Sequence, residues 1–216
     1  MGSKHKTIIV TGASQGIGAG VVEAFLNRGY NVVANSRTIT KSAAFAESAQ
    51  LALVDGNIGE SDVTAKVVEV AIKRFGSIDA LVNNAGIFFT RAFTDYTAED
   101  FKGLSSTNLE GFLYVTQGAV EQMLAQKSVG SVVTITASLV ENPIAGVTAS
   151  VPMITKGGLE AVTRSLASEY AKEHGLSRVR AVWRTLPASR GHSQQQGRTH
   201  RADARLYRQT GTRHRQ

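Results

Sequence analysis

The sequence predicts an α/β fold in which helices cover both faces of a parallel sheet. Short β-branched apolar runs alternate with longer stretches of helical periodicity, most links between them are short, and a glycine-spaced turn joins the first pair. The chain of 216 residues is long enough for one such domain with a sizeable core. Its composition, 42% hydrophobic and 19% charged residues, is typical of globular proteins. Neither an internal repeat nor a second domain is visible.

The elements follow one another in a regular order. The first strand is expected from Thr7, where the sequence is apolar and β-branched, and apolar residues recur at helical spacing after Gly18. Further strands are expected at 31–37, 51–54, 78–82, 132–135 and 179–183, and helices at 43–49, 63–75, 97–106, 108–126 and 153–172. This alternation predicts a doubly wound sheet that is cut short after its sixth strand.

The turn between the first strand and the first helix carries the spacing Thr-Gly-x-x-x-Gly-x-Gly, from Thr11 to Gly18. Glycines let the backbone turn tightly and approach a ligand, and a helix N-terminus offers free N–H groups with partial positive charge. This arrangement suits a phosphate group. An ordinary strand-to-helix turn is the alternative, but the strand before the turn and the helix after it favour a nucleotide site.

This spacing resembles the glycine motif of the short-chain dehydrogenase/reductase family. The resemblance continues at Asn83-Asn84-Ala85-Gly86, at Asn108 and at Lys156, and reaches about Tyr170. It implies a Rossmann-type fold that binds a nicotinamide dinucleotide. Taken with the end of the second strand, the expected cofactor-binding residues are Gly12, Ser14, Gln15, Gly16, Ile17, Gly18, Ser36, Arg37, Asn57, Ile58, Asn84, Ala85, Gly86 and Lys156.

The end of the second strand predicts which cofactor is preferred. In Rossmann units an acidic residue at this place bonds the ribose hydroxyls of NAD. Here Ser36 takes that place and Arg37 follows, so nothing repels a 2′-phosphate and the guanidinium can pair with it. We therefore expect NADP rather than NAD. A solvated arginine at the start of a loop is the alternative.

The catalytic residues that the resemblance implies are Asn108, Ser138 and Lys156, but the match is incomplete. In the family a tyrosine four residues before the lysine exchanges the proton, and the lysine lowers its pKa; here Pro152 stands in that position. The position expected for the serine falls on Ala137, with Ser138 directly after it and Thr136 as another hydroxyl. Asn108 and Lys156 match well, and Lys156 is expected to bond the nicotinamide ribose.

Charge is divided unevenly along the chain. Residues 1–174 hold 14 Lys and Arg against 16 Asp and Glu, whereas residues 175–216 hold 10 Arg and a single acid, Asp203. The family's Pro-Gly pair after the sixth strand is replaced by Trp183-Arg184-Thr185. We expect a dinucleotide-binding domain over 1–183 and a basic, disordered tail over 184–216, which a frameshift would explain. A nucleic-acid-binding tail is a weaker alternative, because no aromatic residues interleave the arginines.

The leading interpretation is an oxidoreductase that transfers hydride between NADP(H) and a carbonyl or alcohol substrate. The alternative is a nucleotide-binding relative with little or no turnover, which Pro152 and the missing Pro-Gly favour. No metal site is expected. The absence of cysteine and of a signal peptide or membrane span suggests the cytoplasm, and the apolar content of 108–126 and 153–172 suggests a homodimer or homotetramer.

Overall fold

The computed structural model describes residues 5–170 and 176–182. Within them a six-stranded parallel sheet has the order β3-β2-β1-β4-β5-β6. The strands are β1 Thr7–Thr11, β2 Asn31–Ser36, β3 Leu51–Asp55, β4 Ala80–Asn83, β5 Gly130–Ile135 and β6 Leu176–Val182. The predicted α/β fold with a doubly wound parallel sheet is therefore confirmed.

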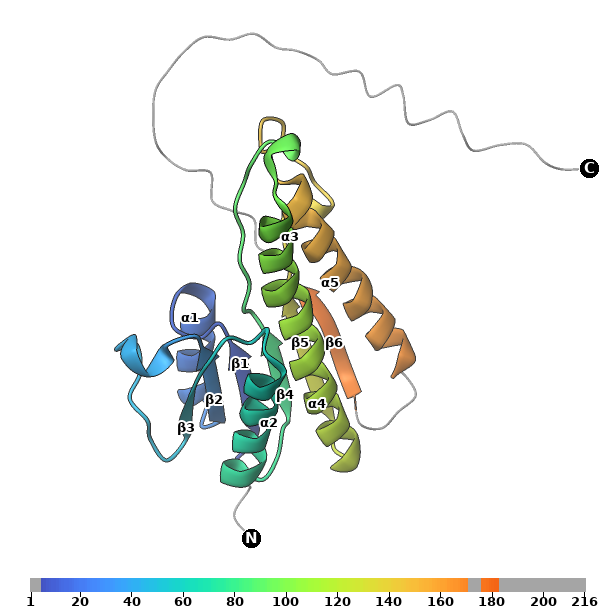
Figure 1. Cartoon of the computed structure of the whole chain (residues 1–216). Coiled ribbons are helices and arrows are strands. Elements are labelled where there is room, and N and C mark those ends of the chain that lie inside the picture. Colours follow the sequence, from blue (N-terminus) through green and yellow to red (C-terminus); the bar gives the residue numbers. More distant parts are fainter. Residues whose placement is uncertain (1–4, 171–175, 183–216) are drawn as a thin grey trace, which may run out of the picture. The chain divides into compact units, whose positions relative to one another are not determined.

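Helices cover this sheet, and α2 and α4 lie side by side over it (Figure 1). The α-helices are α1 Gly16–Leu26, α2 Ser61–Phe75, α3 Ala98–Ser105, α4 Gly111–Ala125 and α5 Ser150–Glu169. Single turns of other helix types are η1 Ile39–Lys41, η2 Phe93–Asp95 and η4 Ser138–Val140, which are 3-10 turns, and η3 Ser106–Glu110, which is a π-turn leading directly into α4. Among the described residues, no helix has the length and apolar character needed to cross a membrane.

Strand β1 is central and every residue in it is buried. Its side chains alternate between two hydrophobic clusters: Ile9 packs with Val67 of α2, whereas Ile8 and Val10 pack with Val22 of α1. A strand covered on both faces has no polar side, which is why its sequence is a continuous apolar run. The chain leaves β3 at one edge and returns as β4 on the other side of β1, so the carboxyl ends of β1 and β4 are adjacent. In open α/β sheets, ligands bind at this reversal of strand order.

The short helix predicted over 43–49 is wrong. The described chain forms the 3-10 turn η1 at Ile39–Lys41 instead, and Ala43 has a positive φ of 53°, which α-helical geometry does not allow. Ile39 explains the difference, because its side chain is fully buried in the cluster around β1 and anchors the turn before the predicted helix could start.

The two long helices begin differently from the prediction. Asn108 lies in the π-turn η3 rather than in regular α-helix, and α5 begins at Ser150, so that Pro152 falls inside its first turn. Proline is tolerated there because the first N–H groups of a helix have no intrahelical partner. β6 ends at Val182, and the predicted tail over 184–216 lies outside the described residues.

Candidate functional site

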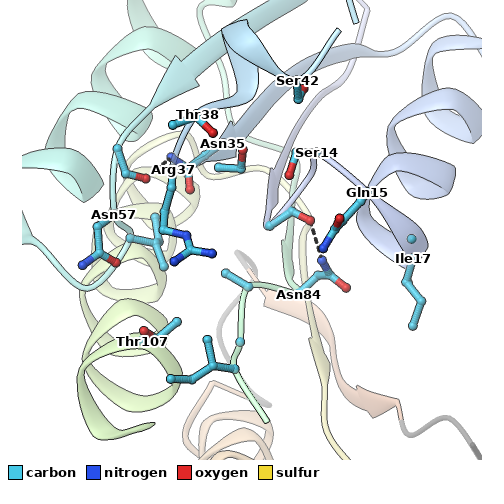
Figure 2. A pocket seen from close by; sticks show the side chains of 18 residues that line it. Ser14, Gln15, Ile17, Asn35, Arg37, Thr38, Ser42, Asn57, Asn84 and Thr107 are labelled. Carbon is cyan, nitrogen blue, oxygen red and sulfur yellow. Dashed lines mark hydrogen bonds between the residues drawn. The ribbon is translucent and has the colours of Figure 1, made fainter. Parts of the chain in front are cut away.

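A cavity of about 660 Å³ opens where the carboxyl ends of β1, β2 and β4 meet (Figure 2). Twelve of the residues expected to bind the cofactor line it: Gly12, Ser14, Gln15, Gly16, Ile17, Ser36, Arg37, Asn57, Ile58, Asn84, Ala85 and Gly86. Gly18, Asn108, Ser138 and Lys156 are not part of its lining. Six lining residues were not predicted: Asn35, Thr38, Ser42, Gly56, Ile87 and Thr107. Apart from Ser42, each is next in sequence to a predicted site residue, which is the signal that could have identified them.

The glycine turn is shaped by close backbone contacts. Gly12 has a φ of 63°, and a Cβ added there would lie 2.8 Å from the Cα of Ala85. A Cβ on Gly18 would lie 2.3 Å from the carbonyl oxygen of Gly12, so Gly18 lets α1 pack against the turn rather than lining the cavity. Gly16 has a φ of 56° and open space beside it. Only glycine adopts these backbone angles without strain, and only glycine leaves this space for a ligand.

Hydrogen bonds join the ends of β1 and β4 beneath the cavity. The Asn84 side chain donates to the carbonyl oxygens of Thr11 and Gly12, at 3.0 and 2.9 Å. The Thr11 hydroxyl accepts from the backbone N–H groups of Asn84 and Ala85, at 3.1 and 3.0 Å. These bonds hold the glycine turn at a fixed distance from the segment that follows β4, and so define the width of the cavity.

At the end of β2 the cavity wall carries polar atoms that lack a protein partner. The Asn35 side chain is 1% exposed and donates to the carbonyl oxygens of Val54 and Gly56, but its Oδ1 atom has no hydrogen-bond partner among the described residues. The buried Oγ of Ser36 likewise has none. Within the part of the chain that the structure describes, no contact engages the guanidinium of Arg37, which also faces this cavity (Figure 2). Buried polar atoms without partners are rare in proteins unless a ligand or water completes them.

These features fit a nicotinamide dinucleotide. The first turn of α1 has no side-chain cap, so its backbone N–H groups remain available for a pyrophosphate. Gly12 and Gly16 provide the close approach that such a group needs, and Ser36 and Arg37 provide a hydroxyl and a cation at the end of β2. Among the described residues, no cluster of three His, Asp or Glu side chains could hold a metal ion.

The side chains of Asn108 and Lys156 both approach Gly86, which lines the cavity. A Cβ on Gly86 would lie 3.0 Å from Nζ of Lys156 and 3.1 Å from Oδ1 of Asn108. The Asn108 side chain accepts from the backbone N–H of Ile87 at 2.8 Å, and donates to the Ile87 carbonyl at 3.1 Å and to the hydroxyl of Thr155 at 3.0 Å. The π-turn therefore connects the segment after β4 to α5 beside Lys156. π-turns often occur at functional sites.

The Lys156 side chain is only 8% exposed, and its ammonium donates to the carbonyl oxygen of Ile135 at 3.3 Å. Burial lowers the pKa of this ammonium, because the charged form loses its hydration. Burying a cation is costly unless an opposite charge pairs with it, and among the described residues no carboxylate forms an ion pair with Lys156.

Pro152 and Ser138 both precede this lysine in the sequence. Pro152 is buried in the first turn of α5, and its carbonyl accepts a hydrogen bond from the Thr155 hydroxyl at 2.9 Å. Ser138 begins the 3-10 turn η4 that follows β5 and Ala137. No ionisable side chain therefore occupies the position of the family's tyrosine.

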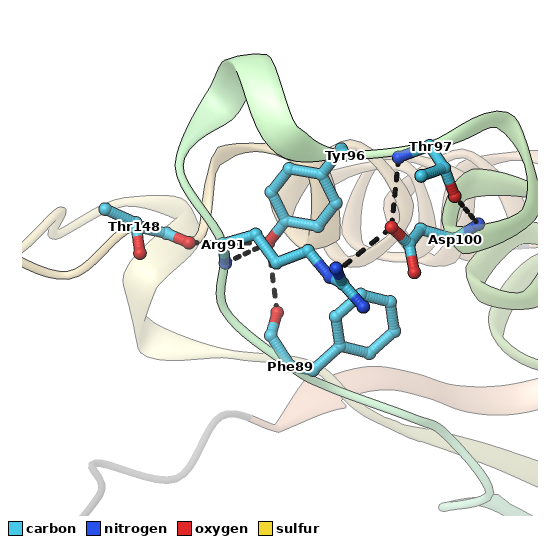
Figure 3. Close-up of polar contacts among 6 residues, drawn as sticks. All are labelled: Phe89, Arg91, Tyr96, Thr97, Asp100 and Thr148. Carbon is cyan, nitrogen blue, oxygen red and sulfur yellow. Dashed lines mark hydrogen bonds and ion pairs between the residues drawn. The ribbon is translucent and has the colours of Figure 1, made fainter.

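One tyrosine is nonetheless brought close to the segment before α5 (Figure 3). The Tyr96 hydroxyl lies 3.0 Å from the carbonyl oxygen of Phe89 and 3.3 Å from that of Thr148, and it accepts from the backbone N–H of Arg91 at 3.1 Å. These backbone groups engage the hydroxyl, so Tyr96 joins the segment after β4 to the segment before α5.

The start of α3 stabilises the same region (Figure 3). Thr97 and Asp100 form a reciprocal capping box, with bonds of 3.1 and 3.0 Å. Arg91 lies 3.4 Å from the Asp100 carboxylate. The hydrogen bonds from Thr97, with Arg91 nearby, lower the pKa of Asp100.

Comparisons with known proteins agree with this architecture. A family model described as short chain dehydrogenase matches residues 6–184. The 3-oxoacyl-(acyl-carrier-protein) reductase FabG of Staphylococcus aureus is 31% identical over 172 residues, which cover 77% of this chain and 69% of the relative. An uncharacterised oxidoreductase of Staphylococcus saprophyticus is 33% identical over 177 residues, covering 78% and 74%.

Solved structures show the same fold. A short chain dehydrogenase from Bacillus anthracis has a TM-score of 0.75 and 25% identity, over 83% of this chain and 76% of the other. A 3-ketoacyl-(acyl-carrier-protein) reductase from Brucella melitensis, solved in complex with NADH, has a TM-score of 0.76 and 26% identity, over 83% and 75%. The fold is thus the NAD(P)-binding Rossmann type, and the chain belongs to the short-chain dehydrogenase family of oxidoreductases.

Proposed function

We propose that this protein is an oxidoreductase that uses NADP(H) and acts on a carbonyl or alcohol group. The observation that carries the cofactor assignment is the end of β2, where Ser36 and Arg37 line the cavity in place of an acid. A carboxylate there would bond ribose hydroxyls and repel a 2′-phosphate, whereas a guanidinium attracts it.

Different groups of the chain would bind different parts of the cofactor. The N-terminus of α1 and the glycine turn would hold the pyrophosphate, and Asn57 and Ile58 would contact the adenine. Lys156 would bond the nicotinamide ribose, with Asn108 holding α5 and the segment after β4 around it. When bound, the cofactor supplies the hydride that such a reaction needs.

The proton that accompanies hydride transfer lacks an evident donor. Pro152 cannot ionise, and a Lys156 engaged with ribose is held away from a substrate oxygen. Ser138 remains a candidate for polarising the carbonyl. This deficit favours the second candidate function, a nucleotide-binding member of the family with little or no turnover.

Two copies of the chain are proposed to pair through α4 and α5. An apolar groove of about 270 Å³ runs between these helices, and it is lined by exposed residues that include Leu113 and Val162, at 44% and 41% exposure. A second copy of the same helices would cover it. A cytoplasmic location remains a prediction from the cysteine-free sequence.

Titration of the protein with NADPH and NADH, followed by fluorescence, tests the cofactor assignment. NADPH should bind more tightly, and Arg37→Ala should remove most of that preference. One charge-assisted hydrogen bond typically contributes about 1.5–3 kcal/mol, or roughly 10- to 150-fold in affinity. Equal affinities in the parent protein would refute the assignment.

A further inference from the structure

A carboxylate lies next to the proposed phosphate-binding corner without lining it. Asp55 is the last residue of β3, and it is paired in register with Ser36 at the end of β2. Both carboxylate oxygens are engaged by Thr40: Oδ1 accepts from its backbone N–H at 2.9 Å, and Oδ2 accepts a short hydrogen bond from its hydroxyl. These bonds lower the pKa of Asp55, so the carboxylate is charged at neutral pH.

Thr40 belongs to η1, the turn that follows the cavity-lining residues Arg37 and Thr38. The two cavity-lining residues, Arg37 and Thr38, are held on both sides. Before it, the carbonyl of Ser36 accepts from the backbone N–H of Gly56 at 3.1 Å. After it, the buried Ile39 anchors the turn in the core, and Asp55 binds the next residue.

We infer that Asp55 is a positioning residue for cofactor selectivity: by binding Thr40 it fixes the turn that aims Arg37 and Thr38 at the 2′-phosphate of NADP. The inference rests on the proposed NADP preference and extends it to a residue that does not touch the cofactor. Arg37 is exposed, and a long exposed side chain loses conformational entropy when it binds. A turn held in advance reduces that cost.

The same geometry explains how an acid can lie near a phosphate site. Asp55 keeps its charge, but both of its oxygens bind Thr40 and Asp55 is not among the residues lining the cavity, so a phosphate bound there does not contact this carboxylate directly. Removing Asp55 should therefore weaken phosphate binding. If Asp55 acted mainly by repulsion, its removal would strengthen binding.

Two nucleotide fragments separate this role from general stability. Calorimetry would measure 2′,5′-ADP, which carries the 2′-phosphate, and 5′-AMP, which lacks it. In Asp55→Ala, 2′,5′-ADP should bind about tenfold more weakly, the effect of losing roughly one hydrogen bond to a charged group. Affinity for 5′-AMP should change less than about threefold, because its contacts lie elsewhere in the cavity.

Matched variants sharpen the result. Thr40→Val removes the hydroxyl donor and should reproduce the loss, whereas Thr40→Ser keeps it and should behave as the parent. Asp62→Ala makes the same change as Asp55→Ala at an exposed site in α2 and should have no effect. If Asp55→Ala fails to fold, the two Thr40 variants decide the question by themselves.

The outcomes are distinguishable. A parent protein that binds both fragments equally overturns the NADP proposal and this inference together. A parent that prefers 2′,5′-ADP, with the preference retained in Asp55→Ala and Thr40→Val, overturns only the role of Asp55. Equal weakening of both fragments, or tighter 2′,5′-ADP binding, also overturns it.

Discussion

At the scale of single residues, Pro152 decides how far the proposed chemistry can proceed. Hydride transfer to a carbonyl requires a proton at the oxygen, and general acid catalysis typically contributes about 10²–10⁴-fold. Proline has no ionisable group, and the Tyr96 hydroxyl, which lies near the segment before α5, is engaged by backbone groups. We expect ketone turnover at least about a hundredfold below that of a relative with the tyrosine.

Pro152→Tyr tests this directly. The substitution falls in the first turn of α5, where the regained N–H needs no helical partner, so the backbone can accept it. Turnover of NADPH with a panel of ketones, aldehydes and quinones should rise. Pro152→Phe is the matched control, since it adds the ring without the hydroxyl and should not raise turnover. Fast turnover by the parent, unaffected by Ser138→Ala or Lys156→Ala, would show that the active site lies elsewhere.

We expect the buried charge of Lys156 to lower the stability of the fold while it strengthens cofactor binding. Lys156→Met keeps the length of the side chain and removes a desolvated charge, so we expect a Tm higher by about 2–4 °C, the shift that ~1 kcal/mol gives in a domain of this size. NADPH binding should weaken in the same variant. A lower Tm together with unchanged NADPH affinity would contradict both parts.

The pH dependence of stability follows from the direction of the pKa shift. Because burial lowers the pKa of Lys156 below its usual 10.5, the folded state binds this proton more weakly than the unfolded chain. Stability from this group therefore rises as pH increases from the lowered pKa towards 10.5. The difference in Tm between Lys156→Met and the parent should shrink over that range.

At the scale of the elements, the π-turn η3 connects parts of the site, whereas the helix pair α4 and α5 provides the proposed pairing surface. The π-turn orients Asn108 towards Ile87 and Thr155, and so connects two segments of the site. The helix pair leaves an apolar groove exposed. Burying apolar surface is favourable by roughly 25 cal/mol per Å², which would favour the proposed pairing of copies.

Light scattering should therefore find a dimer or tetramer at micromolar concentration. Leu113→Glu and Val162→Glu place charges in the groove and should shift the protein to monomer. Val129→Glu is the control, because Val129 is 63% exposed but lies outside the groove. A monomeric parent, or dissociation by Val129→Glu as strong as by the groove variants, would argue against pairing through this surface.

At the scale of the whole molecule, cofactor binding should stabilise the folded state by mass action. A ligand at 100 times its Kd adds about 2.7 kcal/mol to the free energy of unfolding, which corresponds to ~5–10 °C in Tm here. NADPH should produce this shift at a lower concentration than NADH does. If neither nucleotide raises the Tm at millimolar concentration, the cavity is not a dinucleotide site.

Much of this architecture could be read from local patterns. The strand from Thr7, the glycine turn up to Gly18 and the helix that follows depend on side-chain periodicity and on backbone angles that only glycine adopts readily. Such constraints act between residues close in sequence, so they are visible without a structure. Asn84 and Lys156, in contrast, were identified through the resemblance to the family.

The tertiary structure decided what depends on strand register and on burial. Neither the bond from Asp55 to Thr40 nor the buried amide of Asn35 could be anticipated, because both arise from the pairing of β2 with β3. The predicted helix over 43–49 was wrong because one buried side chain, Ile39, outweighed local helix propensity. Sequence alone thus determined the fold and the nucleotide-binding turn, whereas long-range packing determined how the turn at the end of β2 and the lysine on α5 are held.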